Sequence, residues 1–370
     1  MGLLLSSLLH PACASASGSE AGLGLPELPS PPPALVELGR ALFFERRLSA
    51  NDTLSCGMCH LPEQAFTENA LRTSVGMAGV SLRRNAPSLF NVGLHRSLFH
   101  DGRAATLEEQ ALMPLLDPEE MANRSLAEVV ARASAVPGMK RRFALAFGDA
   151  RPTPSRIASA LAAFQRTLVA GGSPFDRWRF GGDDAALPET ARRGFAVFVD
   201  QGCAACHPVG ERDASFTDHR FHNTGIAWRA EARRHEDVTV ELIPGVVARL
   251  APAEIARFGV PDRSDLGRFE VTGHDADLRA FRTPTLRNVE RTGPYMHDGS
   301  LATLDEVIDH YVAGGSADDP AQDPLIRPLR LSADDREALL AFLRSLTSPV
   351  VSPGRTVGSG QGGRVRPRAG

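Results

Sequence analysis

Two copies of one five-residue pattern, Cys-x-x-Cys-His, constrain this chain more than any other feature. They lie at residues 56–60 and 203–207 and use four of the five cysteines. Residue frequencies predict such a pattern by chance only about 0.002 times in a chain of this length. Two thiols three residues apart form thioethers with both vinyl groups of a haem, and the adjacent histidine binds the iron. The pattern predicts two covalently attached c-type haems, with these thioether and iron-binding residues: Cys56, Cys59, Cys203 and Cys206; His60 and His207.

Other uses of paired cysteines fit this sequence less well. A zinc site needs four ligands from adjoining knuckles, but the two pairs lie 147 residues apart and each is followed directly by histidine. A thioredoxin-like redox pair follows a strand in a βαβ unit, and the sequence shows no such unit. Haem attachment leaves only Cys13, so no intramolecular disulfide framework is available.

Composition and the N-terminal segment limit the classes of partner and the cellular locations that this chain can have. The net charge of −3 in 370 residues argues against a nucleic-acid partner, which requires clustered basic residues. The apolar run at residues 2–9 is too short to span a membrane and lacks the basic start of a complete signal peptide. Attachment of c-type haem implies the bacterial periplasm, and a loose lipoprotein-like sequence before Cys13 leaves a lipid anchor open.

Helical periodicity dominates the chain, and no stretch alternates with period two. Ile157, Leu161, Phe164 and Leu168 follow helical spacing up to a Gly-Gly pair. A second helix is expected over residues 189–199, directly before the second haem motif. The sequence therefore predicts a mainly α fold.

An internal repeat is visible in the order of three short motifs. A five-residue segment, a His-Asp-Gly triplet and a Thr-x-x-Glu capping box occur at 85–89, 100–102 and 106–109, and again at 282–286, 297–299 and 303–306. One haem module thus occurs twice, which predicts two cytochrome c-like haem domains. The expected division is an export leader and Pro-rich linker (1–33), an N-terminal haem domain (34–184), a C-terminal haem domain (185–348) and a disordered basic tail (349–370).

The helix expected after Thr303 carries a candidate iron ligand. Leu304, Ile308 and Tyr311 recur at helical spacing, so Tyr311 lies on the buried face. A core tyrosine with a bonded hydroxyl and a phenolate ligand of the second haem iron are both consistent with this spacing. Met296 and His297 are rival ligands by residue type.

These motifs in combination resemble the bacterial di-haem cytochrome c peroxidase family, which includes the MauG-like enzymes. The resemblance covers about residues 34–348 and rests on these segments: 54–60, 99–104, 107–114, 202–207, 284–288 and 294–299. It implies that the first haem is peroxidatic and that the second passes electrons to it. It also places Gln110 and Glu120 over the peroxide, and a calcium ion at Asn85, Thr292 and Pro294.

Three residues depart from the common pattern of that family. Met77 stands where many members carry a histidine that closes the first iron, and a thioether binds ferric iron weakly, so we expect an open site there. His100 replaces the tryptophan between the haems and becomes the expected electron-transfer bridge. Tyr311 occupies the position of the methionine ligand of typical peroxidases and of the tyrosine ligand of MauG-like members. An anionic oxygen favours ferric and higher states, whereas a thioether favours ferrous iron.

The sequence therefore predicts a di-haem oxidoreductase that reduces hydrogen peroxide with electrons from a small cytochrome c or copper protein. Glu120 is the expected proton relay, and Gln110 would orient the peroxide. A MauG-like oxidase that modifies side chains of a partner protein and a non-enzymatic di-haem electron carrier are the alternatives. Whether the chain forms a homodimer is left open.

Overall fold

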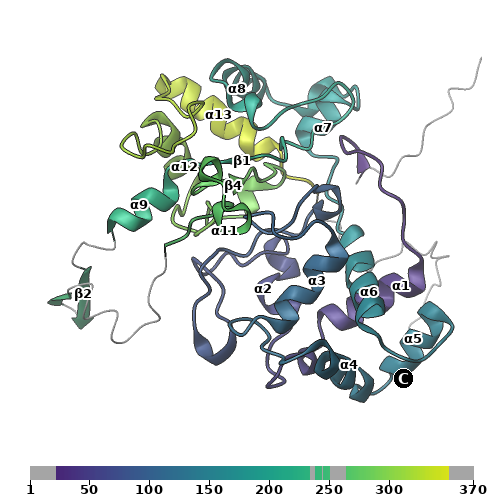
Figure 1. The fold of residues 1–370 in the computed structure, drawn as a ribbon. Coiled ribbons are helices and arrows are strands. Elements are labelled where there is room, and N and C mark those ends of the chain that lie inside the picture. Colours follow the sequence, from purple (N-terminus) through teal and green to yellow (C-terminus); the bar gives the residue numbers. More distant parts are fainter. Residues whose placement is uncertain (1–21, 234–237, 244, 251–263, 350–370) are drawn as a thin grey trace, which may run out of the picture.

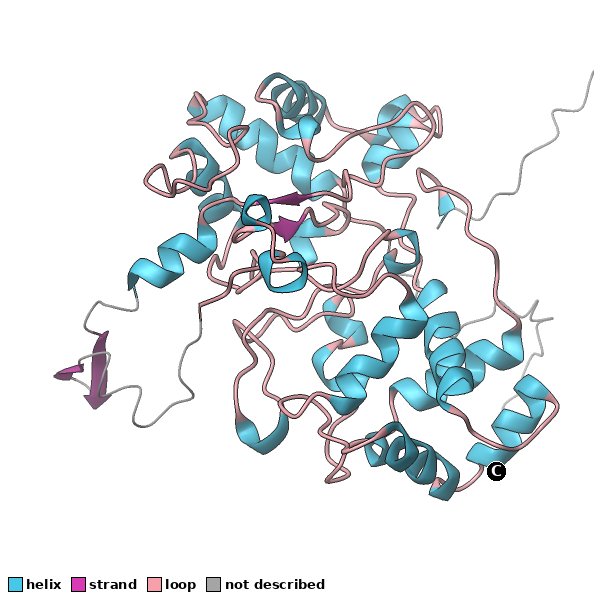
Figure 2. Ribbon diagram, in the orientation of Figure 1, coloured by secondary structure: helices cyan, strands magenta, loops and turns pink. Residues whose placement is uncertain are grey.

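The fold consists of helices joined by long irregular loops, with only short strands (Figures 1 and 2). The computed structural model describes residues 22–233, 238–243, 245–250 and 264–349. The prediction of a mainly α fold is confirmed. The expected leader up to residue 21, with Cys13, and the expected tail from residue 350 lie outside the described residues. None of the helices in the described ranges combines the length and apolar character needed to cross a membrane.

The first half of the chain packs around one hydrophobic cluster. Its helices are α1 (Pro33–Phe43), α2 (Cys56–Cys59), α3 (Leu107–Leu116), α4 (Leu126–Ala135), α5 (Met139–Phe147) and α6 (Pro154–Arg166). α1 lies against α6, and the rings of Phe43, Phe66 and Phe164 meet between them. α6 ends at Arg166, two residues earlier than the apolar spacing predicts, although Leu168 beyond its end is still buried.

The second half packs around a separate, more aromatic cluster. Its helices are α7 (Pro174–Arg179), α8 (Glu189–Asp200), α9 (Ile226–Arg233), α11 (Phe269–Thr272), α12 (Leu304–Val312) and α13 (Ala333–Ser345). α8 lies against α13, and the rings of Phe175, Phe198 and Phe342 pack together. The helix predicted over residues 189–199 is thus confirmed.

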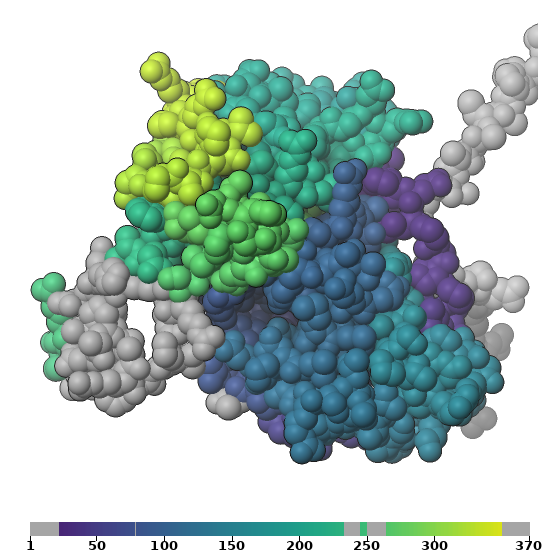
Figure 3. Space-filling model, viewed as in Figure 1, coloured from purple at the N-terminus to yellow at the C-terminus, as the bar shows by residue number. Residues whose placement is uncertain are grey.

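The strands form two small antiparallel pairs. β1 (Phe221–His222) pairs with β4 (Phe281–Arg282) inside the second half. β2 (Val238–Ile243) and β3 (Val246–Leu250) form a hairpin that projects away from both halves (Figures 1 and 3).

Each half contains one glycine at its closest helix crossing. A Cβ added to Gly39 of α1 would lie 1.8 Å from the carbonyl oxygen of Ala160 on α6. A Cβ added to Gly194 of α8 would lie 1.8 Å from the carbonyl oxygen of Ala338 on α13. These crossings therefore require a residue without a side chain.

The two predicted Thr-x-x-Glu caps begin α3 and α12. Thr106 accepts a hydrogen bond from the N–H of Glu109, and Glu109 in turn accepts one from the N–H of Ala105. Thr303 and Glu306 repeat both contacts at the start of α12. The glutamate bonds the residue before the cap, one position earlier than in a standard capping box.

The two halves meet along a broad boundary (Figure 3), where buried charges pair across it. The Arg84 guanidinium donates two hydrogen bonds of 2.7 Å to Asp265 and contacts Asp101 at 2.5 Å. Its side chain is only 11% exposed, so removing one partner would leave a poorly solvated charge. The segment before α1 is also anchored, because the carbonyl of Gly24 accepts hydrogen bonds from Ala214 and Arg287 of the second half.

Gly39→Ala tests the helix crossing. Alanine has the higher helix propensity, but its Cβ would overlap a backbone carbonyl. We therefore expect the free energy of unfolding to fall by about 1–3 kcal/mol. The melting temperature should fall by about 2–4 °C per kcal/mol, measured by circular dichroism. Arg40→Ala, at a half-exposed neighbouring position, is the control and should change the free energy of unfolding by less than about 0.5 kcal/mol. Equal melting temperatures for the two variants would contradict this account.

Candidate functional site

The first haem motif holds its histidine in a defined orientation and tautomer. The short helix α2 carries Cys56 and Cys59, and His60 follows as its C-cap. His60 Nδ1 lies 3.1 Å from the carbonyl oxygen of Phe66. A carbonyl oxygen can only accept, so Nδ1 carries the proton and Nε2 keeps a free lone pair. That is the arrangement in which a histidine binds a metal through Nε2.

The second motif repeats this arrangement. His207 Nδ1 lies 2.8 Å from the carbonyl oxygen of Phe216. Both accepting carbonyls belong to buried phenylalanines with left-handed backbone, φ 54° at Phe66 and φ 50° at Phe216. Such a conformation costs about 1–3 kcal/mol at a non-glycine residue and persists only where the surroundings enforce it. The four thiols of the two motifs are free, so the residues present fit covalent attachment of two haems.

A large cavity lies beside the first motif and faces the boundary between the halves. Its volume is about 1200 Å³, more than a drug-sized ligand needs. Cys59 and His60 line it, together with residues from the second half such as Glu270 and Arg282. A smaller, mostly apolar chamber adjoins it and is lined by Cys56, Cys59 and His60.

Gln110 and Glu120 line both spaces, as the sequence predicts for groups that act at the first haem. Gln110 projects from α3, and Glu120 lies in the turn after that helix. Burial raises the pKa of the Glu120 carboxyl to about 7, with Asp117 and Glu119 adding to the shift and Arg103 opposing it. A carboxyl with this pKa both accepts and donates protons near neutral pH.

Sequence reasoning missed two polar residues that line the large cavity. Gln165 is 5% exposed and lines both spaces from α6, within a run of apolar side chains. Arg103 lines the larger cavity, bonds Asp101 and lies 3.5 Å over the Phe99 ring. A glutamine on the apolar face of a predicted helix was a signal that could have identified Gln165. Arg103 lies in the segment 99–104 that carries the family resemblance, but no role was predicted for it.

Met77 lies in a loop that contacts the turn after α3, beside the inner chamber. Its backbone N–H donates a 2.7 Å hydrogen bond to the carbonyl of Glu119, and Gly76 packs against the same carbonyl. Among the described residues that line the two spaces, Val75 and Gly76 of this loop are present and Met77 is not.

His100 lies where the two halves meet. Its Nε2 is 2.9 Å from the carbonyl of Asn85, so Nε2 carries the proton. Burial lowers the pKa of His100 to about 3, and nearby His297 and Arg84 add to this shift, so its ring is neutral. The carbonyl of His100 accepts a 2.7 Å hydrogen bond from the N–H of Arg282 in the second half.

The three candidate ligands of the second iron lie in different surroundings. Tyr311 is on α12, and burial, with smaller contributions from the nearby Cys203 and Cys206, raises the pKa of its hydroxyl. The ring of His297 instead stacks on Phe281, with centroids 3.6 Å apart. Met296 has left-handed backbone, φ 72°.

The residues expected to bind calcium belong to segments that touch. The N–H of Asn85 donates a 2.8 Å hydrogen bond to the carbonyl of His297, three residues after Pro294. The Asn85 amide nitrogen donates to the carbonyl of Arg72, so its Oδ1 is the side-chain atom that calcium would need. Thr292 ends the 3-10 turn Val289–Arg291 just before Pro294.

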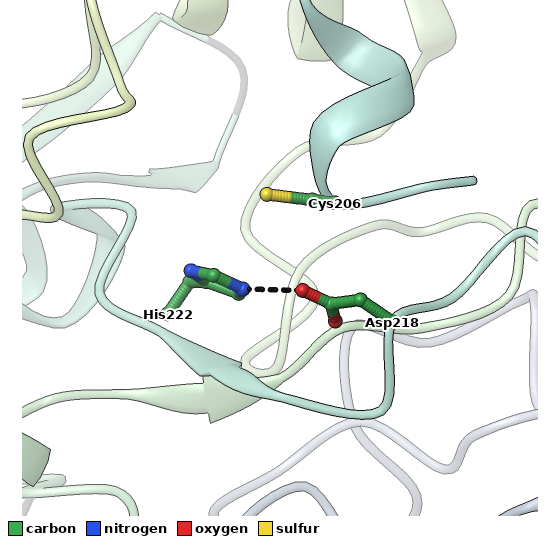
Figure 4. Close-up of side chains that lie close together, drawn as sticks. All are labelled: Cys206, Asp218 and His222. Atoms are coloured by element: carbon green, nitrogen blue, oxygen red, sulfur yellow. Dashed lines mark hydrogen bonds and ion pairs between the residues drawn. The ribbon is translucent and has the colours of Figure 1, made fainter.

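A compact polar cluster lies beside Cys206 (Figure 4). Ligand atoms of Cys206, Asp218 and His222 all lie within 4.8 Å of one another, a spacing that a metal ion could bridge. His222 Nε2 is 2.9 Å from Asp218 and Nδ1 is 2.5 Å from Asp323. Contact with the Cys206 sulfur, and then with the two carboxylates, raises the pKa of His222 to about 10. Haem attachment would turn the Cys206 thiolate into a thioether and so remove the strongest metal ligand of this cluster.

Comparison with known proteins decides the family. The sequence model described as di-haem cytochrome c peroxidase matches residues 33–185. The methylamine utilization protein MauG of Methylorubrum extorquens is 39% identical over 316 residues, which cover 85% of this chain and 78% of that protein. The chain belongs to the di-haem cytochrome c peroxidase family. The predictions of this family and of a haem-dependent peroxidase-type oxidoreductase are thus confirmed.

Further relatives agree with this assignment. The cytochrome c551 peroxidase of Nitrosomonas europaea is 32% identical over 314 residues, 85% of this chain and 80% of that protein. A crystal structure of a MauG-like protein associated with microbial copper homeostasis superposes with a TM-score of 0.69 at 33% identity, covering 87% of this chain and 93% of that one. The di-haem peroxidase BthA of Burkholderia thailandensis gives a TM-score of 0.67 at 26% identity, covering 86% and 87%.

Glu120→Gln tests the proton relay. Peroxide must lose a proton before its oxygen–oxygen bond breaks, and glutamine cannot accept it, so we expect kcat/KM for peroxide to fall at least about tenfold. In the parent enzyme kcat/KM should rise with pH through about 7, as Glu120 ionises, and the variant should lose this inflection. Peroxide turnover measured between about pH 5 and 9 tests both expectations.

Glu119→Gln is the matched control. Glu119 is exposed and lines only the outer cavity, whereas Glu120 also lines the inner chamber beside His60. The control should keep kcat/KM within about twofold of the parent. If both variants kept the parent rate, Glu120 would have no part in proton transfer.

Proposed function

We propose that this chain reduces hydrogen peroxide at a haem held by Cys56, Cys59 and His60. Electrons would enter through a second haem held by Cys203, Cys206 and His207. The single observation that carries this proposal is the inner chamber, where Glu120 and Gln110 lie next to His60. The haem would supply an iron that binds peroxide, Gln110 would orient the peroxide, and Glu120 would move its proton.

We propose that the two halves are haem domains related by an internal repeat. Three paired features support this: the carbonyl contact of each haem histidine, the glycine at each main helix crossing and the cap of each later helix. The backbone agrees in detail, since Asn91 and Asn288 have φ 60° and 59°, and Phe99 and Met296 have φ 66° and 72°.

The boundary between these domains would lie near residues 171–173. Phe175 of α7 is fully buried in the second hydrophobic cluster, whereas the first cluster ends at Ala170. The boundary predicted at residues 184/185 would separate α7 from the cluster that it helps to form. The boundary was predicted just before the start of α8, which Pro188 marks in the sequence. α7 and the following 3-10 turn come before this point, so the prediction assigned them to the first half.

The position of Met77 supports the proposal of an open first iron. The loop of Met77 is bonded to Glu119, and the side chains that it brings to the cavity are those of its neighbours. The alternative, in which the Met77 thioether binds the iron, would require this loop to rearrange.

The as-isolated ferric protein should therefore show one high-spin haem. Electron paramagnetic resonance of the holoprotein measures this, and Met77→Leu should leave the high-spin signal unchanged, because Met77 is not a ligand. Two low-spin haems in the parent, one becoming high-spin in Met77→Leu, would instead assign Met77 to the iron.

Tyr311 favours a second candidate function, that of a MauG-like oxidase acting on side chains of a partner protein. Its hydroxyl lies near Cys203 and Cys206, as a ligand of the second iron must. A phenolate ligand stabilises the oxidised iron and makes the second haem a poor store of electrons. The enzyme would then retain the two oxidising equivalents of peroxide until a protein substrate supplied electrons.

Peroxide added without a donor separates these functions. A MauG-like enzyme should retain both oxidising equivalents for many seconds, which a reductant titration followed by absorbance measures. A peroxidase should lose them quickly, and an electron carrier should not react. Tyr311→Met should raise the potential of the second haem and shorten the retention, whereas Tyr295→Phe, which removes a hydroxyl bonded to Val289, is the control that should not.

The remaining assignments follow from this function. A calcium ion would bind Asn85 and the carbonyls of Thr292 and Pro294, where the two halves touch. His100 would lie on the electron path between the haems. Haem attachment would require the periplasm, where a small cytochrome c, a copper protein or a protein substrate would meet the enzyme. A lipid anchor at Cys13 and a homodimer are both compatible with this proposal, and neither is required by it.

A further inference from the structure

Arg282 is a buried charge that has no acidic partner among the described residues. Its side chain belongs to β4 of the second half, and the residue is only 7% exposed. Its guanidinium donates to the carbonyls of Phe99, at 3.4 Å, and Thr283, at 3.2 Å. Burial lowers the pKa of Arg282 to about 10, and within the described residues no carboxylate counteracts that shift.

The other buried arginines of this region are paired. Arg84 bonds Asp265 and Asp101, and Arg287 bonds Asp176. Removing a charge from water costs several kcal/mol unless an opposite charge compensates. Arg282 therefore points to an anion that the part of the chain described by the structure does not supply.

Two histidines next to Arg282 also have buried ring nitrogens without partners. His95 Nε2 and His219 Nδ1 are enclosed and have no hydrogen-bond partner within the described residues. The two rings contact each other across the boundary between the halves, with centroids 6.4 Å apart. Burial and the nearby Arg282 hold the pKa of His95 well below its usual value. The three side chains thus combine one fixed positive charge with two unused imidazole nitrogens.

Arg282 and His95 both line the large cavity that His60 lines. A haem tethered to Cys56 and Cys59 through its vinyl groups carries two propionates on the opposite edge of its ring. Arginine binds carboxylates in a planar, two-bond geometry, and these charge-assisted bonds are roughly twice as strong as neutral ones. A propionate of a haem in this cavity would therefore supply Arg282 with the anionic partner that it lacks among the described residues.

We propose that Arg282 of the second half binds a propionate of the first haem and that His95 donates to the same carboxylate. This inference rests on the haem placement proposed above and extends it to a contact between the halves. The N–H of Arg282 also bonds the carbonyl of His100, the expected electron-transfer bridge. One residue of the second half thus contacts both the first haem and the bridge.

Arg282 would then set the potential of the first haem. A ferrous haem carries one positive charge less than a ferric haem, so a nearby cation favours the ferrous form. Arg282→Gln should lower the midpoint potential of the first haem, with the ferrous-to-ferric ratio at the parent midpoint falling at least about tenfold, which is 59 mV for one electron. Arg282→Lys keeps the charge and should recover most of this loss.

Spectroelectrochemical titration of the holoenzyme measures both potentials after the haem content of each variant has been checked. Arg124→Gln removes an equal charge from a side chain that is 89% exposed and should shift neither potential. A crystal structure of the parent holoenzyme should place a propionate oxygen within about 3.2 Å of the Arg282 guanidinium.

Three outcomes would overturn the inference: no propionate at Arg282 in that crystal structure, unchanged potentials in Arg282→Gln, or a shift confined to the second haem. Each of these leaves the proposed function intact if the parent holds two haems and turns over peroxide. A parent protein with fewer than two covalent haems would instead refute the haem placement itself.

Discussion

The hydrogen bond from each haem histidine to a backbone carbonyl is the contact on which the rest of the structure depends. It fixes the proton on Nδ1 and leaves Nε2 for iron, at His60 through Phe66 and at His207 through Phe216. Each carbonyl is aimed by a left-handed phenylalanine whose ring is buried in the hydrophobic cluster of its own half. Core packing and metal binding are thereby coupled, because the ring that stabilises the core also holds the carbonyl in place.

The contact between the halves brings together the residues that we propose to act at the first haem. The cavity beside His60 is lined by Glu120 from the first half and by Arg282 from the second. Arg84 joins the halves through Asp265, and His100 lies at the same boundary. The large cavity is lined by both halves, whereas the inner chamber is lined by the first half alone. Burial raises the pKa of Glu120, and low polarity strengthens each polar contact inside.

Features set by residues close together in the chain were predicted well, whereas contacts between distant segments were not. The Cys-x-x-Cys-His motifs, the helix over residues 189–199 and the two threonine caps follow from residues close together in the chain. The end of α6 was placed too late, because Leu168 is buried by tertiary contacts after the helix has ended. The membership of α7 in the second cluster also depends on contacts with residues far along the chain, such as Phe342.

The sequence by itself determined the covalent chemistry and the family, since both reside in contiguous motifs whose spacing is set by the bonds they form. It also identified Gln110 and Glu120, although only through resemblance, because neither residue lies in a pattern of its own. Only the tertiary structure decided which polar groups are buried together. Gln165 and Arg282 become significant because folding buries both of them in the cavity that His60 also lines. Helical spacing indicates which face of a helix is buried, but which buried polar groups meet depends on segments that are far apart in the chain.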